Sequence, residues 1–418
     1  MAGPIAALSG TRPKLVVIGN GMAPGRALER LFAVAPDAYD ITIFNAEPRV
    51  NYDRIMLSPL LSGEKSFDDI VIHGDGWYIR HGVTLYKGTK IIAIDRARRT
   101  VTSQNGIVAP FDKLIIATGS MPVILPVPGH ALPGVLTYRD LDDVQAMILA
   151  AQARGKAIVI GGGLLGLEAA AGLADRGMEV TVVHLMPTLM ERQLDPAAGA
   201  LLQGALEARG IQVITGANTC AILGSNRVAG VALDDGRMLP AHLVVMAVGI
   251  RPNAGLASAA GLTVNRGIVV DDMMRTSDSA IFALGECAES AGQVFGLVAP
   301  LYEMANVVAA QLIGPSPARF NPSAVATKLK VTGINLFSAG DFAAGPDRHD
   351  AVLVDPASGV YKRFVLKDNR VIGAVLYGDT AHSAWVFDLI RSQTHISGIR
   401  DTLVFGPSYS EPNVLKAA

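Results

Sequence analysis

The stretch IVIGGGLLGLEAAAGLA, residues 158–174, contains the pattern that decides the fold. An apolar run rich in β-branched residues ends at Gly161 and a helical pattern follows, which predicts a strand, a glycine-rich turn and a helix. Gly161, Gly163 and Gly166 have the spacing Gly-x-Gly-x-x-Gly. In such a turn the glycines allow a tight bend, close approach of a pyrophosphate to the backbone, and close packing of the helix on the strand. The stretch therefore predicts a dinucleotide-binding site, and a purely structural glycine turn is the alternative.

A second glycine-rich break occurs earlier, in LVVIGNGMAPGRALERL, residues 15–31. Gly19 and Gly21 match the pattern, but Pro24 stands where the third glycine is expected. Proline is tolerated in the first turn of a helix because the N–H groups there have no partner within the helix. Glu47, after the next predicted strand, is a candidate ligand of an adenosine ribose, and a solvated loop carboxylate is the alternative. This stretch predicts a second, less regular dinucleotide site.

Strand and helix patterns alternate around both turns, with YDITIFNAE (39–47) and MEVTVVHL (178–185) as the next strands. This order predicts an α/β fold with two doubly wound dinucleotide-binding domains. From about residue 320 the pattern changes to alternating strands, TKLKVTGINLFSAGD (327–341) and VYKRFVLKDNRVIGAVLYGDT (360–380), with Asp-Asn at a hairpin turn. We therefore expect a C-terminal α+β domain after the two α/β domains.

Composition narrows the classes of function. The chain has 418 residues, of which 50% are hydrophobic, and a formal net charge of -1, so it is long enough for several domains and has no basic footprint for nucleic acid or anionic membranes. No basic region precedes the short apolar stretch at the start, and no apolar segment is long enough to span a bilayer. We expect a soluble, cytoplasmic chain. Its two cysteines, Cys220 and Cys287, are too far apart for a Cys-x-x-Cys pair, and we predict no metal site.

Six motifs in order resemble the two-dinucleotide flavoprotein reductases, the pyridine nucleotide-disulfide oxidoreductase-like superfamily with a glutathione-reductase-like fold. They are GNGM (19–22), AEPRVNYDRIMLS (46–58), LIIATGS (114–120), GGGLLGLEAA (161–170), VGIRPN (248–253) and TSDSAIFALGECA (276–288). The chain is similar in particular to the N-terminal part of the NAD(P)H-dependent assimilatory nitrite reductase large subunit, and also to rubredoxin and ferredoxin reductases. The resemblance implies a discontinuous FAD-binding domain at 11–125 and 250–320, an NAD(P)H-binding domain at 126–249 and the C-terminal α+β domain at 321–418.

The resemblance also implies roles for particular residues. The residues expected to bind FAD are Gly19, Gly21, Met22, Glu47, Arg54, Ala117, Thr118, Gly119, Gly285 and Glu286. Those expected to bind NAD(P)H are Gly161, Gly163, Leu165, Gly166, His184 and Gly249. Glu168 resembles the glutamate that these reductases place near the nicotinamide, and we predict it as the catalytic residue; an ordinary exposed helix carboxylate is the alternative.

Three positions depart from the family pattern. Ala46 stands where many relatives have the ribose-binding acid, which leaves Glu47 as the nearest substitute. Pro59 stands where ferredoxin-reductase-like members have a lysine beside the flavin, so a lysine–glutamate pair with Glu168 is not available. His184 stands where an NAD-selective carboxylate is usual. A neutral imidazole neither strongly attracts a ribose hydroxyl nor repels a 2′-phosphate, so the choice between NADH and NADPH stays open.

The resemblance implies hydride transfer from NAD(P)H to FAD and electron transfer to a separate iron–sulfur or haem protein, as the flavin reductase component of nitrite or nitrate assimilation. Nitrite chemistry itself is expected on another polypeptide, and a homodimer is one assembly to consider. Lysines and an arginine in KLKVTG (328–333) and YKRFVLK (361–367) are expected to present a basic face to an acidic partner, with a solvated surface as the alternative. Other functions left open are a rubredoxin or ferredoxin reductase, an oxidase or diaphorase acting on oxygen or quinones, a coenzyme sensor and a structural scaffold, whereas the missing thiol pair disfavours a disulfide reductase.

Overall fold

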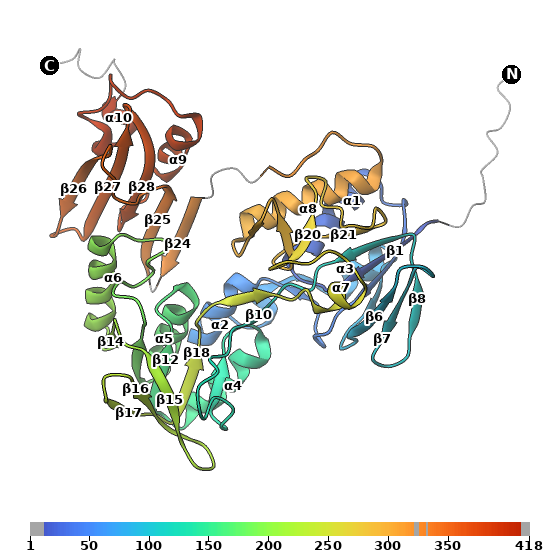
Figure 1. Ribbon diagram of the computed structural model, residues 1–418, viewed down its shortest axis with the longest axis horizontal. Coiled ribbons are helices and arrows are strands. Elements are labelled where there is room, and N and C mark those ends of the chain that lie inside the picture. The colour runs from blue at the N-terminus through green and yellow to red at the C-terminus, as the bar shows by residue number, and fades with distance from the viewer. Residues whose placement is uncertain (1–11, 322–325, 332, 411–418) are drawn as a thin grey trace, which may run out of the picture. The chain divides into compact units, whose positions relative to one another are not determined.

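The computed structural model describes residues 12–321, 326–331 and 333–410, and the chain divides into two compact units (Figure 1). Unit 1 contains the described residues up to Met56, Ser66–Met121 and Ile250–Asn321. Unit 2 contains Leu57–Lys65, Pro122–Gly249 and the described residues from 326 onward. The chain therefore passes between the units several times.

Unit 1 is built on a parallel five-stranded sheet in the order β21-β9-β1-β2-β5. The strands are β1 (Lys14–Ile18), β2 (Asp40–Phe44), β5 (Thr84–Tyr86), β9 (Lys113–Ile116) and β21 (Ile281–Ala283). Helix α1 (Met22–Val34) follows β1, and its apolar residues contact α8 (Val298–Ile313), which lies beside it in Figure 1. A three-stranded antiparallel sheet of β6 (Ile91–Asp95), β7 (Thr100–Ser103) and β8 (Val108–Pro110) belongs to the same unit. Beyond their first residues, β1 and β9 are buried and apolar, and β21 is buried throughout, as expected where a parallel sheet is covered on both faces; β5, at the sheet edge, is exposed or half-buried.

Unit 2 repeats this plan with a parallel sheet in the order β11-β18-β12-β13-β14. The strands are β11 (Val135–Thr137), β12 (Gly155–Ile160), β13 (Met178–Val183), β14 (Gln212–Ile214) and β18 (Leu243–Met246). The helices are α2 (Leu57–Ser62), α4 (Leu141–Gln152), α5 (Leu164–Asp175) and α6 (Pro196–Ala208), and α2 contacts both α4 and α5. A further antiparallel sheet is formed by β15 (Thr219–Gly224), β16 (Val228–Leu233) and β17 (Met238–Pro240). Each predicted glycine-rich turn thus lies between a parallel strand and a helix.

The C-terminal part of unit 2 is an antiparallel sheet in the order β24-β25-β28-β27-β26, covered on one side by α9 (Ser383–Ser392) (Figure 1). Its strands are β24 (Ala326–Val331), β25 (Ile334–Gly340), β26 (His349–Asp355), β27 (Val360–Lys367) and β28 (Arg370–Tyr377). Asp368 and Asn369 join β27 to β28 with φ values of 49° and 53°, both left-handed, as a two-residue hairpin turn requires. The predicted fold class, two doubly wound α/β domains followed by an α+β domain, is confirmed.

Buried polar contacts connect the C-terminal sheet to helix α6 within unit 2. Asp195 caps the start of α6 by accepting from the Ala198 N–H at 3.0 Å. The same carboxylate accepts from the Tyr361 hydroxyl at 2.6 Å and from Arg363 Nη1 at 3.1 Å. Asp195, Tyr361 and Arg363 are all buried, so this cluster satisfies charges that would otherwise be costly to bury.

None of the helices in the described residues combines the length and the low charge that crossing a bilayer would require.

Candidate functional site

The predicted FAD residues lie at the carboxyl ends of neighbouring strands in unit 1. Gly19 follows β1, Ala117 to Gly119 follow β9, and Gly285 follows β21. Gly19 has a φ of +104°, and a Cβ added there would lie 2.2 Å from the carbonyl oxygen of Ala117. Only glycine fits such a position. The carboxyl edge of a parallel sheet is where open α/β folds bind ligands, and the sheet brings these segments to one edge.

Unit 2 repeats this arrangement around the second turn. Gly161 has a φ of +120°, and a Cβ there would lie 2.3 Å from the carbonyl oxygen of Ala247, which follows β18 as Ala117 follows β9. A Cβ on Gly166 would lie 2.0 Å from the carbonyl oxygen of Gly161, so the third glycine lets α5 lie directly on the turn. Gly249, also predicted to bind the coenzyme, stands at the same edge after β18.

The helix starts fit an anionic ligand in both units. Gly21 is the residue before α1 and Gly163 the residue before α5, and a glycine has no side chain that could cap the first N–H groups of its helix. Apart from the two neighbouring residues in the chain, no described protein atom lies within 4 Å of a Cβ built on either glycine. The N–H groups of the first turn point along the helix axis and favour negative charge, as a pyrophosphate provides. Met22 and Leu165, both predicted to bind cofactor, lie in these first turns.

A different polar side chain supports each turn. Below the first turn the buried Asn51 amide donates to the carbonyl oxygens of Asn20 at 2.8 Å and Gly21 at 2.7 Å. Beside the second turn His184 Nδ1 accepts from the Gly162 N–H at 3.0 Å. These contacts fix the backbone that faces the ligand, which is the preorganisation that a binding site needs.

Two of the predicted FAD residues pair with each other. Arg54 Nη2 donates to Glu47 Oε1, and the Tyr52 hydroxyl donates to Glu47 Oε2 at 2.7 Å. The Arg54 guanidinium also lies 5.0 Å from the centre of the Tyr52 ring. Glu47 is therefore a structured carboxylate rather than a solvated one, and the role we predicted for it, contact with ribose, stays a prediction.

Hydrogen bonds connect the segments that contain Thr118, Gly119 and Glu286, three further residues predicted to bind FAD. The Ser120 hydroxyl donates to Glu286 Oε2 at 2.8 Å, which joins the segment after β9 to the segment after β21. Thr118 Oγ1 donates to the carbonyl oxygen of Asn253 at 2.7 Å, and the Asn253 N–H donates to that of Gly119 at 2.9 Å. These hydrogen bonds keep Thr118, Gly119 and Glu286 at one edge of the sheet.

Glu168 belongs to a buried hydrogen-bonded group in unit 2. Ser58 Oγ, on α2, donates to Glu168 Oε2 at 2.7 Å and lies 2.9 Å from the hydroxyl of Tyr138. Because the single serine proton goes to the carboxylate, Tyr138 is the donor to Ser58 when Glu168 is ionised. Burial raises the pKa of Glu168 to about 7 although the Ser58 hydrogen bond opposes the change. Burial also raises the pKa of Tyr138, so this hydroxyl keeps its proton. Serine thus takes the place of the absent lysine as partner of Glu168.

The thiol next to Glu286 is not exposed for chemistry. Cys287 is fully buried, and its Sγ donates to the carbonyl oxygens of Leu284 at 3.3 Å and Ile116 at 3.5 Å. Burial raises the pKa of this thiol, so the reactive thiolate is disfavoured. Cys287 is therefore a small buried residue of the unit 1 core.

The basic face expected from YKRFVLK is wrong at two of its residues. Lys362 and Arg363 are buried, because Lys362 pairs with Asp379 at 2.6 Å while Arg363 pairs with Asp195 at 3.1 Å and Asp350 at 2.9 Å. Lys367 alone of the three is exposed. The side chains of the lysines in KLKVTG lie outside the part of the chain that the structure describes. Lys362 and Arg363 are therefore paired with carboxylates inside unit 2 and do not contribute to a basic face.

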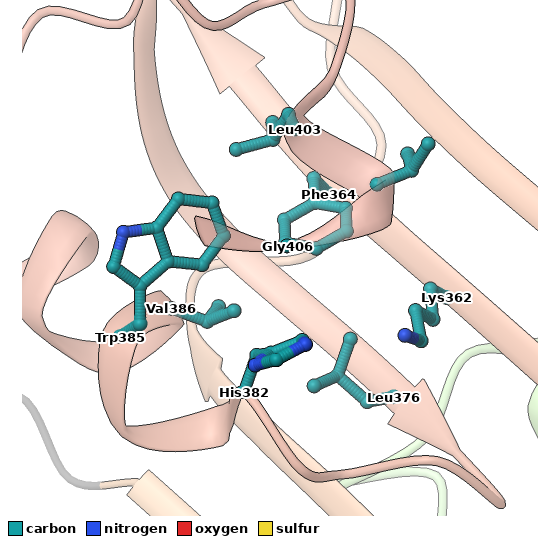
Figure 2. A pocket seen from close by; sticks show the side chains of 9 residues that line it. Lys362, Phe364, Leu376, His382, Trp385, Val386, Leu403 and Gly406 are labelled. Atoms are coloured by element: carbon teal, nitrogen blue, oxygen red, sulfur yellow. The ribbon is translucent and has the colours of Figure 1, made fainter. Parts of the chain in front are cut away.

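A small pocket lies next to Lys362 on the C-terminal sheet, between β27, β28 and the start of α9 (Figure 2). Figure 2 shows His382, Trp385 and Leu403 around it, with the Lys362 side chain at one end. Its volume is about 10 Å³, which is about what one water molecule needs. The pocket is too small for a coenzyme.

Comparison with known proteins identifies the family. Residues 13–312 match the pyridine nucleotide-disulphide oxidoreductase family, and residues 326–394 match the rubredoxin NAD⁺ reductase C-terminal domain. The chain belongs to the pyridine nucleotide-disulphide oxidoreductase family. It is therefore an NAD(P)H oxidoreductase that uses FAD, as predicted, and the two sites described above are its FAD and NAD(P)H candidates.

Individual relatives cover nearly the whole chain. The chain is 45% identical over 400 residues to a nitrite reductase [NAD(P)H] of Bacillus subtilis (strain 168), covering 96% of this chain and 50% of that protein. It is 42% identical over 401 residues to an assimilatory nitrate reductase electron transfer subunit of the same strain, covering 96% of this chain and 52% of that protein. The chain thus spans about half the length of these curated relatives. Among solved structures, that of a covalent putidaredoxin reductase–putidaredoxin complex aligns with a TM-score of 0.83 at 27% identity, over 93% of this chain and 95% of that chain.

Sequence reasoning missed several residues that the site depends on. Asn51, Ser58 and Ser120 lie inside or next to the quoted motifs, so their polar side chains beside predicted ligand residues were an available signal. Tyr138 lies outside every motif, and no local pattern distinguishes it. Its role depends on contact with Ser58, which is distant in sequence.

Proposed function

We propose that this oxidoreductase passes electrons from NAD(P)H through FAD to a separate iron–sulfur or haem protein, as the flavin reductase component of a nitrite or nitrate assimilation system. The similarity to the nitrite reductase and to the electron transfer subunit supports this proposal, since it extends over 96% of the chain. The observation that carries the need for a separate acceptor is Cys287, which is fully buried and bonded to backbone carbonyls. The chain's one cysteine near the FAD residues is therefore unsuited to accept electrons from the flavin.

FAD and NAD(P)H, when bound, supply the hydride and electron-transfer chemistry. The residues of this chain bind and orient them: α1 and α5 direct their first N–H groups at the two pyrophosphates, while Asn51 and His184 fix the turns before these helices. Ser58 and Tyr138 orient the Glu168 carboxyl. Because Ser58 donates to Oε2, a proton held by Glu168 sits on Oε1, and a pKa of about 7 lets the carboxyl hold or release it near neutral pH.

A rubredoxin or ferredoxin reductase is the second candidate. Two observations favour it: residues 326–394 match the rubredoxin NAD⁺ reductase C-terminal domain, and the putidaredoxin reductase chain is covered over 95% of its length. Both candidates use the same flavin and coenzyme sites and differ in the acceptor. A cytoplasmic location and a homodimer are further predictions, which cell fractionation and light scattering would check.

The test is anaerobic stopped-flow reduction of the purified chain followed by turnover with chosen acceptors. We expect a yellow protein that releases FAD on denaturation, rapid flavin reduction by NAD(P)H, rapid turnover with ferricyanide and slow turnover with oxygen. Turnover with a nitrite or nitrate reductase catalytic subunit, but not with rubredoxin or ferredoxin, supports the first candidate, and the reverse supports the second. Fast oxygen turnover would make the chain an oxidase, and a colourless protein that cannot take up FAD would contradict both.

A matched variant tests the role of the buried thiol. We expect Cys287→Ser to keep FAD and to reduce ferricyanide at a rate within about twofold of the wild type, because a structural thiol contributes packing rather than chemistry. Cys220→Ser, at an exposed position on β15, is the control. Loss of acceptor turnover in Cys287→Ser with FAD still bound and reducible would place a thiol in the electron path.

A further inference from the structure

The loop of residues 184–195, between β13 and α6, is held against the second glycine-rich turn. Gly162 is bonded to it twice, since its N–H donates to His184 Nδ1 at 3.0 Å and its carbonyl oxygen accepts from the Met190 N–H at 3.0 Å. A Cβ on Gly162 would lie 2.6 Å from Leu189 Cδ2 and 2.7 Å from His184 Cγ. The loop therefore packs on the turn that faces the coenzyme pyrophosphate.

The hydrogen bonds of His184 determine where its proton lies. Nδ1 accepts a hydrogen bond from a backbone N–H, so it carries no proton, and the neutral ring has its hydrogen on Nε2. Nε2 lies 3.2 Å from Glu191 Oε2 and donates to it. Both ring nitrogens are therefore used inside the protein, and the side chain is only 10% exposed. His184 has no polar atom left for a ribose hydroxyl.

Glu191 is the acid that the sequence pattern lacks at the end of β13. Its side chain is 32% exposed, and the His184 ring that holds it occupies the strand-end position itself. Because Nδ1 accepts from the Gly162 N–H, the ring carries no positive charge that would offset the Glu191 carboxylate. In dinucleotide folds a carboxylate at this end of the second strand bonds the adenosine ribose. We propose that Glu191 reads the 2′ position of the coenzyme's adenosine ribose, accepting a hydrogen bond from a 2′-hydroxyl and repelling a 2′-phosphate, and that His184 is the residue that positions it.

Arg192 is the competing charge in this loop. Its side chain is 86% exposed, and its Nε lies 3.9 Å from Glu191 Oε1. A guanidinium binds phosphate well, so Arg192 favours the coenzyme with the 2′-phosphate, whereas Glu191 disfavours it. Asp195, the other acid of the loop, is bonded to Tyr361 and Arg363 instead. The balance at the 2′ position therefore depends on Glu191, and the wild-type chain is expected to prefer NAD⁺ over NADP⁺.

The proposal rests on coenzyme binding at the Gly161 turn, and calorimetric titration of the FAD-loaded chain with NAD⁺ and with NADP⁺ tests it without turnover. In Glu191→Gln the amide oxygen still accepts from His184 Nε2 while the charge is removed. We expect the ratio of the NADP⁺ to the NAD⁺ dissociation constant to fall about tenfold. Glu179→Gln, a 77% exposed acid on β13, is the control and should leave the ratio unchanged. Arg192→Gln should raise the ratio.

The positioning role of His184 has its own variant. Asparagine at position 184 keeps an acceptor for the Gly162 N–H but is too short to hold Glu191, so His184→Asn should lower the same ratio by less than Glu191→Gln does. Equal weakening of both nucleotides in His184→Asn would show a merely structural role. An unchanged ratio in Glu191→Gln, or a wild-type preference for NADP⁺, would overturn the proposal. A wild-type chain that binds neither nucleotide would instead overturn the coenzyme site at Gly161.

Discussion

The turn at Gly19 and the turn at Gly161 have the same backbone plan but different supports. In each, the first glycine has a left-handed φ and faces the carbonyl oxygen of an alanine after a neighbouring strand, Ala117 in one and Ala247 in the other. The first turn is held by the Asn51 amide, which donates to two carbonyl oxygens. The second is held by His184, which accepts from an N–H. The strand–turn–helix geometry is thus shared, while the side chains that fix it are free to differ.

The third glycine of the pattern shows why one turn looks irregular in sequence. Gly166 is required because a Cβ there would lie 2.0 Å from the carbonyl oxygen of Gly161. In the first turn the small residue comes one position later, where a Cβ on Gly25 would lie 3.1 Å from Asn51 Nδ2. Pro24 itself is buried in the first turn of α1, where its missing N–H costs no helix hydrogen bond. The departure therefore reflects how the helix packs, and it does not indicate a lost ligand.

The largest effects should come from the first glycine of either turn. Gly19→Ala and Gly161→Ala force a side chain into a left-handed backbone and against a carbonyl oxygen at 2.2 and 2.3 Å. We expect each to lower the free energy of unfolding by about 3 kcal/mol or more, since strained backbone alone costs about 1–3 kcal/mol. Urea unfolding measures this. Gly204→Ala, in α6 with no described atom within 4 Å of its Cβ, is the control and should be neutral or stabilising. Wild-type stability in both turn variants would contradict the shared plan.

The second glycine of each turn should affect binding rather than folding. Gly21→Ala and Gly163→Ala meet no described atom within 4 Å, so both proteins should fold normally. The added methyl group occupies the space before the helix start, and we expect Gly21→Ala to weaken FAD and Gly163→Ala to weaken NAD(P)H, each by about tenfold or more. Fluorescence titration of FAD and calorimetry with NAD⁺ separate the two. If either variant weakened both cofactors equally, the assignment of one cofactor to each turn would be wrong.

The turns were predictable because their information is local. A β-branched run, glycines at fixed spacing and a helical pattern occupy one short stretch, and the same holds for the Asp368–Asn369 hairpin. Ser58 and Tyr138 were not predictable as partners of Glu168, because α2, the segment after β11 and α5 meet only in the folded unit. Glu191 required the ring orientation of His184, which no sequence pattern contains.

The prediction of a basic face on β27 is wrong for a related reason. The alternating residues of β27 predict one exposed and one buried face of the strand. In the structure both faces are covered from Tyr361 to Leu366. Arg363 is covered because Asp195, at the start of α6, accepts from it. A charged residue within a strand is usually exposed, and the exception here needed a partner more than a hundred residues away in sequence.

The smallest expected effect is a pH-dependent change in stability that distinguishes α5, the helix after the second turn, from α1, the helix after the first. Glu168 in α5 and Arg26 in α1 stand at the same distance from the glycine that precedes their helix, but only Glu168 can change charge near neutral pH. Burial raises its pKa from 4.5 to about 7, so the folded chain keeps a proton that the unfolded chain releases. The associated stability is present below pH 4.5 and is lost as the pH rises through 7.

Glu168→Gln cannot lose stability in this way. The free energy of unfolding of Glu168→Gln minus that of the wild type should therefore be larger at pH 8 than at pH 5, by about 1 kcal/mol after allowance for partial solvent screening. Urea unfolding at several pH values measures this difference, and Glu179→Gln is the exposed control. If the difference in free energy of unfolding between the wild type and Glu168→Gln were the same at every pH, Glu168 would titrate as an ordinary surface carboxylate.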